Sequence, residues 1–154
     1  MATTSAAAEP APFEALRRQR AELRESMSAL ELALAGPAAS GEARWVGRVN
    51  VALVELSADF RAHVEFTEGD EGLYTDVLAT APRLSGAVDR LTAEHSEIGD
   101  LLEGLLTVTA TTEIEDVDRV RSLGTALLGV LVTHRQRGAD LVYQAYEFDI
   151  GGET

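Results

Sequence analysis

The stretch LSGAVDRLTAEHSEIGDLLEGL, residues 84–105, decides the fold. Its apolar residues recur three or four positions apart, and this spacing places them along one face of an α-helix. The face is formed by Leu84, Val88, Leu91, His95, Ile98, Leu102 and Leu105. The sequence therefore predicts a long helix whose buried face carries His95 near its middle.

Three further segments show the same spacing and end at glycine-containing turns. In chain order, the first covers residues 13–35, the second follows the break at 37–41, has its apolar face over 49–67 and ends near 69–70, and the fourth covers 120–148. A short extra turn is expected around residues 73–78, and the polar, β-branched run 107–112 predicts a break in the helix. His63 lies on the apolar face of the second segment, and His134 lies on that of the fourth. On the first segment, the matching position is Arg20.

Four helical segments joined by short connections fold most simply as an antiparallel up-down-up-down four-helix bundle, an all-α fold. In that arrangement Arg20 and His63 lie at adjoining ends of two helices, and His95 and His134 share a level on the other two. We therefore expect all three histidines of the chain, together with one arginine, to point toward the bundle axis at one end.

Length and composition limit the class of protein. A chain of 154 residues has room for one domain. We expect residues 1–11 to form a disordered N-terminal arm and residues 12–154 to form the bundle. The net charge of -13 argues against binding to nucleic acid or to a membrane surface, and no apolar run is long enough to span a bilayer. With no secretory signal, a cytoplasmic protein is expected.

The residue types point to a particular kind of metal site. The chain has no cysteine, so thiolate ligands are excluded, and any metal would be bound by histidine and carboxylate. A single histidine on a buried face is usually a structural residue. Three histidines buried at one depth cost more free energy unless a partner satisfies their ring nitrogens. This cost favours a metal site that binds iron, manganese or zinc.

Four stretches carry a resemblance to a known family. They are LRRQRAEL at 16–23, FRAHVEFTEGDEGLY at 60–74, LTAEHSEI at 91–98 and THRQRGADLVYQAYEFDIGGE at 133–153. In these stretches the chain resembles the hemerythrin-like, HHE cation-binding proteins, whose four-helix bundles bind non-haem iron. The resemblance implies His63, His95 and His134 as ligands, with Glu68 and Asp140 as the nearest matches to the family's carboxylates. It also implies a mononuclear or dinuclear iron site and a small ligand such as dioxygen, peroxide or nitric oxide.

The chain departs from the family's pattern at several positions. Gln19-Arg20 stands where the family has Glu-His, so a permanent cation replaces one ligand. Thr67 occupies the usual place of a glutamate, and Glu68 is rotated by about 140° from His63 in an ideal helix. Asp140 faces about 120° away from its histidine by the same geometry, so neither carboxylate is fixed as a ligand by the sequence.

These departures leave three functions open. The first is a metal-binding protein that senses or binds a small ligand. The second is a metal-free bundle that serves as a scaffold, in which Arg20 pairs with a buried carboxylate, Glu68 first and Glu71 second. The third is an enzyme that degrades peroxide or oxidises iron, for which the sequence gives no independent support.

Overall fold

The computed structural model describes residues 11–39, 41–110 and 116–147. Within these residues it contains helices and no strands, which confirms the predicted all-α class. The elements are α1 (Ala11–Ala35), α2 (Glu42–Glu68), α3 (Leu73–Thr80), the 3-10 helix η1 (Pro82–Leu84), α4 (Ser85–Ala110) and α5 (Val117–Tyr146). None of these helices is both long enough and apolar enough to cross a membrane.

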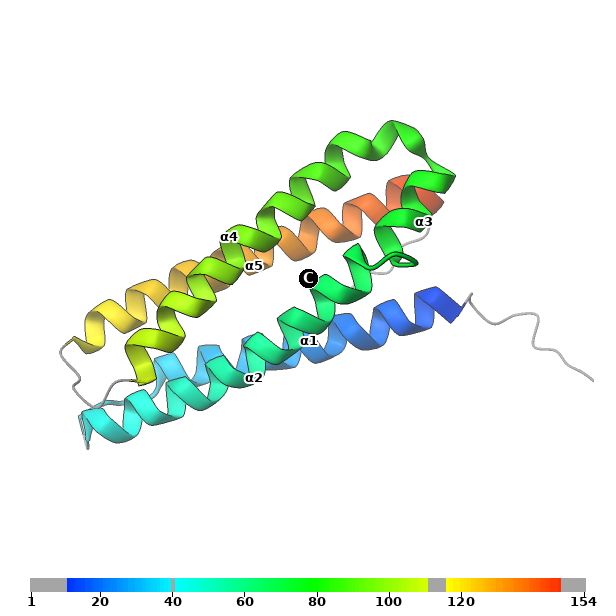
Figure 1. Ribbon diagram of the computed structural model, residues 1–154. Coiled ribbons are helices and arrows are strands. Elements are labelled where there is room, and N and C mark those ends of the chain that lie inside the picture. The colour runs from blue at the N-terminus through cyan, green and yellow to red at the C-terminus, as the bar shows by residue number, and fades with distance from the viewer. Residues whose placement is uncertain (1–10, 40, 111–115, 148–154) are drawn as a thin grey trace, which may run out of the picture.

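The four long helices of the described part of the chain form a helical bundle (Figure 1). Helix α1 packs along α2, and α4 packs along α5. Further contacts join α2 to α4 and α1 to α5, so each long helix touches two others. The short helix α3 follows α2 and contacts both α2 and α5, near the end of the bundle where α1 begins.

Most predicted helix boundaries agree with the structure, and one does not. The short turn expected at 73–78 is present as α3. The expected break at 107–112 is wrong at its start, because α4 continues to Ala110. Thr109 is accommodated there by donating its hydroxyl to the carbonyl oxygen of Leu105 at 2.8 Å. The predicted N-terminal arm, except for Ala11, and the Gly151-Gly152 stop lie outside the described residues.

The buried apolar side chains form two clusters along the bundle. One cluster surrounds Trp45 and Leu53, both fully buried, and extends to Phe60. The other contains Phe13 at the start of α1, Tyr74 in α3, and residues near the end of α5. His95 contacts both clusters, with ring centroids 5.7 Å from Phe60 and 6.0 Å from Tyr74. The histidines therefore lie between two apolar regions.

Candidate metal centre

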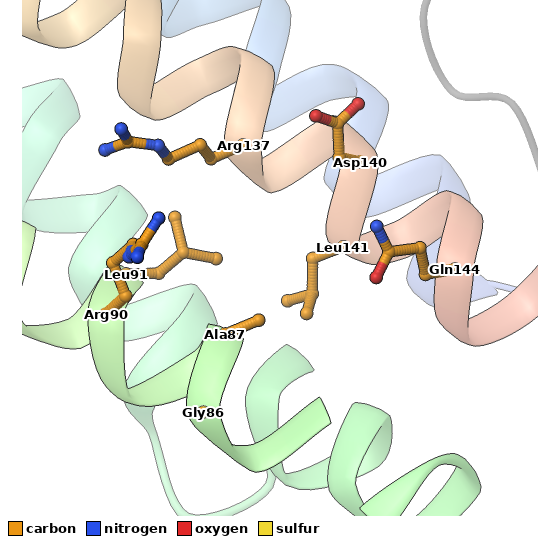
Figure 2. A pocket seen from close by; sticks show the side chains of 8 residues that line it. All are labelled: Gly86, Ala87, Arg90, Leu91, Arg137, Asp140, Leu141 and Gln144. Carbon is orange, nitrogen blue, oxygen red and sulfur yellow. The ribbon is translucent and has the colours of Figure 1, made fainter. Parts of the chain in front are cut away.

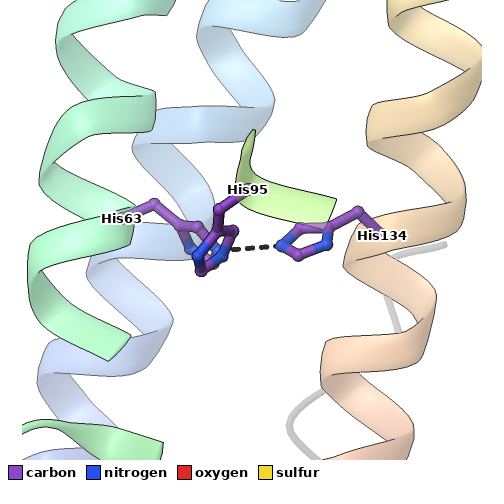
Figure 3. A group of neighbouring side chains, drawn as sticks. All are labelled: His63, His95 and His134. Atoms are coloured by element: carbon purple, nitrogen blue, oxygen red, sulfur yellow. Dashed lines mark hydrogen bonds between the residues drawn. The ribbon is translucent and has the colours of Figure 1, made fainter. Parts of the chain in front are cut away.

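Three histidines from three helices meet inside the bundle. His63 comes from α2, His95 from α4 and His134 from α5 (Figure 3). Each offers one ring nitrogen, and these atoms all lie within 4.8 Å of one another. His95 and His134 are buried, with 5% and 2% of their surface exposed, and His63 is half-buried. The predicted convergence of the three histidines is confirmed.

The Nδ1 atom of His63 faces the side-chain oxygen of Gln19 on α1, at 3.2 Å. The amide of Gln19 is oriented by its own nitrogen, which donates to the backbone carbonyl of Asp59 at 3.5 Å. Because the amide oxygen can only accept, Nδ1 of His63 carries the proton and donates it. When this imidazole is neutral, its Nε2 atom therefore has a lone pair and no proton.

His134 is oriented in the same way by Glu94 on α4. Its Nδ1 donates to Oε1 of Glu94 at 2.7 Å, and Oε2 of the same carboxylate accepts from Arg137. Burial raises the pKa of Glu94, but hydrogen bonds from His134 and Arg137 outweigh this, and the pKa is lowered overall. Glu94 is therefore ionised at neutral pH, and Nε2 of neutral His134 is also a bare lone pair.

His95 completes the pattern through Glu68, the last residue of α2. The carboxylate of Glu68 contacts Nδ1 of His95. The chain turns sharply just after Glu68 and brings Gly72 back against the end of α2. A Cβ atom on Gly72 would lie 2.7 Å from the carbonyl oxygen of Phe66, so the turn requires glycine at this position. This turn leaves Glu68 at the very end of its helix, where its side chain reaches His95.

The Nε2 atoms of the three neutral imidazoles consequently carry no proton. Those of His63 and His134 are 3.1 Å apart, and Nε2 of His95 is buried without a hydrogen-bond partner in the described residues (Figure 3). Burial lowers the pKa of His63 and of His134, and the neighbouring histidine charges lower both further. Protonation is therefore disfavoured, and the unprotonated ring nitrogens of the three histidines could hold a metal ion.

Arg20 is buried close to this group. Its charge contributes to the low pKa of His63, and its Nη1 donates to the backbone carbonyl of Arg135 at 3.4 Å. Arg20 lines a cavity of about 20 Å³ together with Thr67 and the rings of His63 and His134. A cavity of that size has room for about one water molecule.

The two carboxylates that the sequence suggested as metal ligands, those of Glu68 and Asp140, have other partners in the structure. Glu68 contacts Nδ1 of His95, so it orients an imidazole on the side away from the shared centre. It is thus engaged with His95, whereas the sequence suggested it as the first partner of Arg20. Asp140 is exposed, and its carboxylate accepts a hydrogen bond from Gln136 at 3.1 Å. The structure does not bring Asp140 to the histidines.

Sequence reasoning missed two residues of this centre, Gln19 and Glu94. Gln19 was noted only as a departure from the family's pattern, although it is buried and contacts His63. Glu94 directly precedes His95, and helical geometry turns it about 100° away from that histidine, toward α5. A glutamate buried on a helix face is rare unless paired, and its position beside the apolar face was the available indication.

No protein-family model, no curated protein sequence and no solved structure matches the chain. The resemblance to hemerythrin-like proteins therefore depends on the residues of this chain alone.

Proposed function

We propose that this protein is a hemerythrin-like four-helix bundle that binds one metal ion, iron being the expected ion, through His63, His95 and His134. In this proposal it binds or senses a small ligand such as dioxygen, peroxide or nitric oxide. One observation carries it: each Nδ1 atom faces an oxygen acceptor, while one ring nitrogen of each histidine lies within 4.8 Å of the others and the Nε2 atoms of His63 and His134 are 3.1 Å apart. Acceptors on the outer nitrogens of ligand histidines are the usual support of a metal site.

An antiparallel up-down-up-down order of the helices is part of the proposal. It is supported by the connection of only six residues between α1 and α2, Gly36–Gly41, because short connections join antiparallel neighbours. It is also supported by the second apolar cluster, where Phe13 and Leu16 near the start of α1 join Leu141 and Val142 near the end of α5.

The residues around the centre have separate tasks in this function. Gln19, Glu68 and Glu94 keep a proton on each Nδ1, so that every Nε2 presents its lone pair inward. Leu16, Leu23 and other apolar side chains wall the adjoining cavity and limit the entry of water. A metal ion bound by three imidazoles would supply an open coordination position, as three-histidine sites do, where a small ligand could bind.

Arg20 favours one ion over two. Its guanidinium is a permanent cation, and its effect on the pKa of His63 places it near the ligand group. A second cation would therefore meet a like charge in a poorly solvated interior. Replacing Arg20 by histidine should raise the iron content above that of the parent, with new absorption from charge transfer between ligand and metal. An unchanged iron content would mean that Arg20 does not occupy a ligand position.

The direct test is metal analysis of the purified protein and of metal-free protein reconstituted anaerobically with ferrous iron. We expect one ion per chain and a change in the visible spectrum when nitric oxide is added. The His95→Ala variant should lose the ion, because a ligand is removed. Asp140→Asn is the matched control, since it neutralises a sequence-predicted ligand that lies at the surface, and its iron content should equal that of the parent.

Two outcomes would contradict the proposal. Parent protein that binds no transition metal under these conditions would favour the metal-free scaffold. Parent and His95→Ala proteins with equal metal content would place the ion elsewhere.

A further inference from the structure

A second recess lies on the surface between α4 and α5, separate from the cavity beside the histidines. It has a volume of about 360 Å³. Its floor includes the buried side chains of Leu91 and Leu141, and Ala87 adds a further apolar surface. Figure 2 shows these side chains between the two helices, with Arg90 from α4 and Arg137 from α5 directed to the same end of the recess.

These two arginines bring positive charge together on a chain with a net charge of -13. Arg90 makes no hydrogen bond or ion pair with another residue in the described part of the chain. Arg137 binds Glu94 through Nη1, yet its side chain is 44% exposed, so most of its five N–H donors remain accessible. A third cation, Arg83, donates to the backbone carbonyl of Gln144, which lines the other end of the recess.

The negative groups nearby leave these donors available. Glu94 is engaged on both oxygens, by His134 and Arg137. Asp140 also lines the recess, but its side chain points away from Ala87 and Leu91 in Figure 2 and its carboxylate accepts a hydrogen bond from Gln136. Two guanidinium groups at one end of an apolar recess suit a carboxylate, because a guanidinium binds both oxygens of a carboxylate in parallel.

We propose that this recess between α4 and α5 binds a small organic monocarboxylate with an apolar body. The carboxylate binds Arg90 and Arg137, and the apolar body lies on Leu91 and Leu141. Inorganic phosphate suits the recess less well. It offers nothing to the apolar floor, and its greater negative charge is repelled more strongly by the acidic chain.

The test uses isothermal titration calorimetry with benzoate as the probe, on the full chain at neutral pH and low salt. We expect a dissociation constant of about 1 mM, and weaker binding as salt is added. The Arg90→Gln variant should bind benzoate about tenfold more weakly, because one charge-assisted contact is lost. Arg119→Gln is the matched control: it makes the same change in net charge at the start of α5, and its benzoate affinity should equal that of the parent.

Two further probes test the two halves of the proposed ligand. Benzamide keeps the ring without the charge, and phosphate keeps the charge without the ring, so both should bind at least about tenfold more weakly than benzoate. The proposal is overturned if benzoate does not bind at about 10 mM, or if Arg90→Gln binds it as well as the parent does. Equal affinity for benzamide or for phosphate would also overturn it.

Discussion

The apolar level of the bundle around Trp45 and the histidine level around His63, His95 and His134 both lie in the interior, yet they are stabilised differently. Trp45, Leu30 and Leu53 have no exposed surface and are held by packing against apolar neighbours. His95 and His134 are almost as buried, but each is a polar group whose Nδ1 faces a carboxylate. The first level gains free energy from burial alone, whereas the second buries polar groups whose cost must be offset by partners, and we propose that a metal cation is one of them.

Each level contains polar atoms that lack an ordinary hydrogen-bond partner. Around Trp45, the indole Nε1 has no hydrogen-bond partner among the described residues, and the guanidinium of Arg121 lies 5.0 Å from the ring centroid. At the histidine level, two lone pairs face each other at 3.1 Å between His63 and His134. In our proposal, a bound metal ion relieves the contact between these two lone pairs. We therefore expect that mutations at the apolar level change stability without changing metal binding, and that mutations at the histidine level change metal binding.

The largest expected effect is on stability, at the apolar level. Trp45→Ala should lower the free energy of unfolding by about 3–5 kcal/mol, because a large buried side chain is lost and a cavity remains. Urea denaturation measures this, and metal analysis of the folded variant should still give the parent's ratio. Leu32→Ala is the control, since Leu32 is 74% exposed and its loss should cost less than about 0.5 kcal/mol. Loss of metal from folded Trp45→Ala would show that the two levels are not independent.

Removal of the metal should affect the histidine level next most strongly. At a metal concentration about 100 times the dissociation constant, chelation should lower the free energy of unfolding by about 2.7 kcal/mol. Paired urea titrations with and without chelator measure the difference. Trp45→Ala should show the same difference as the parent, and His95→Ala should show none. A full difference in His95→Ala would place the stabilising ion at another site.

A smaller effect should follow from changing the groups that orient the ligand histidines. Glu94→Gln and Glu68→Gln should each weaken metal binding about 10- to 100-fold, because the acceptor loses its charge while the ligand remains. Asp140→Asn, which carries the same chemical change at the surface, should leave the affinity unchanged. Competition with a chelator of known affinity measures all three. A loss of affinity in Asp140→Asn alone would restore Asp140 as a ligand.

Much of the fold could be predicted from the sequence, because helical periodicity is a local property. The apolar spacing of residues 84–105 lies within η1 and α4, and the short turn at 73–78 is present as α3. The break predicted from residue 107 is wrong as far as Ala110, because β-branched propensity was weighed more than the side-chain hydrogen bonds of Thr109. Within a packed helix, such bonds and tertiary contacts outweigh intrinsic preference.

The histidine group could be predicted, but the acceptors around it could not. The depth of each histidine follows from counting along an apolar face, and this brought His63, His95 and His134 together. The partners of Nδ1 depend on side-chain direction between helices, which a single sequence does not encode. Glu94 on α4 reaches across to His134 on α5, although it neighbours His95 in the chain.

The last expected effect is on the pH dependence of the metal-free protein. Burial, with the nearby positive charges, lowers the pKa of His63 and His134 in the folded protein from the ordinary value of 6.5. As the pH falls below about 6.5, the unfolded chain therefore takes up these protons first, and the folded state loses stability. Each histidine contributes at most about 1.4 kcal/mol per pH unit. Metal binding should weaken with falling pH as well, since protons compete for the same nitrogens.

Urea denaturation of metal-free protein between pH 7.5 and about 5 measures this slope, above the range in which ordinary carboxylates titrate. The double variant His63→Leu, His134→Leu is the control, and its stability should vary less over the same range. The opposite result is equally informative. If the metal-free parent became more stable as the pH fell from 7.5 to about 6, a proton would be shared between the two Nε2 atoms 3.1 Å apart. The histidine level would then be complete without a metal, and its difference from the apolar level would disappear.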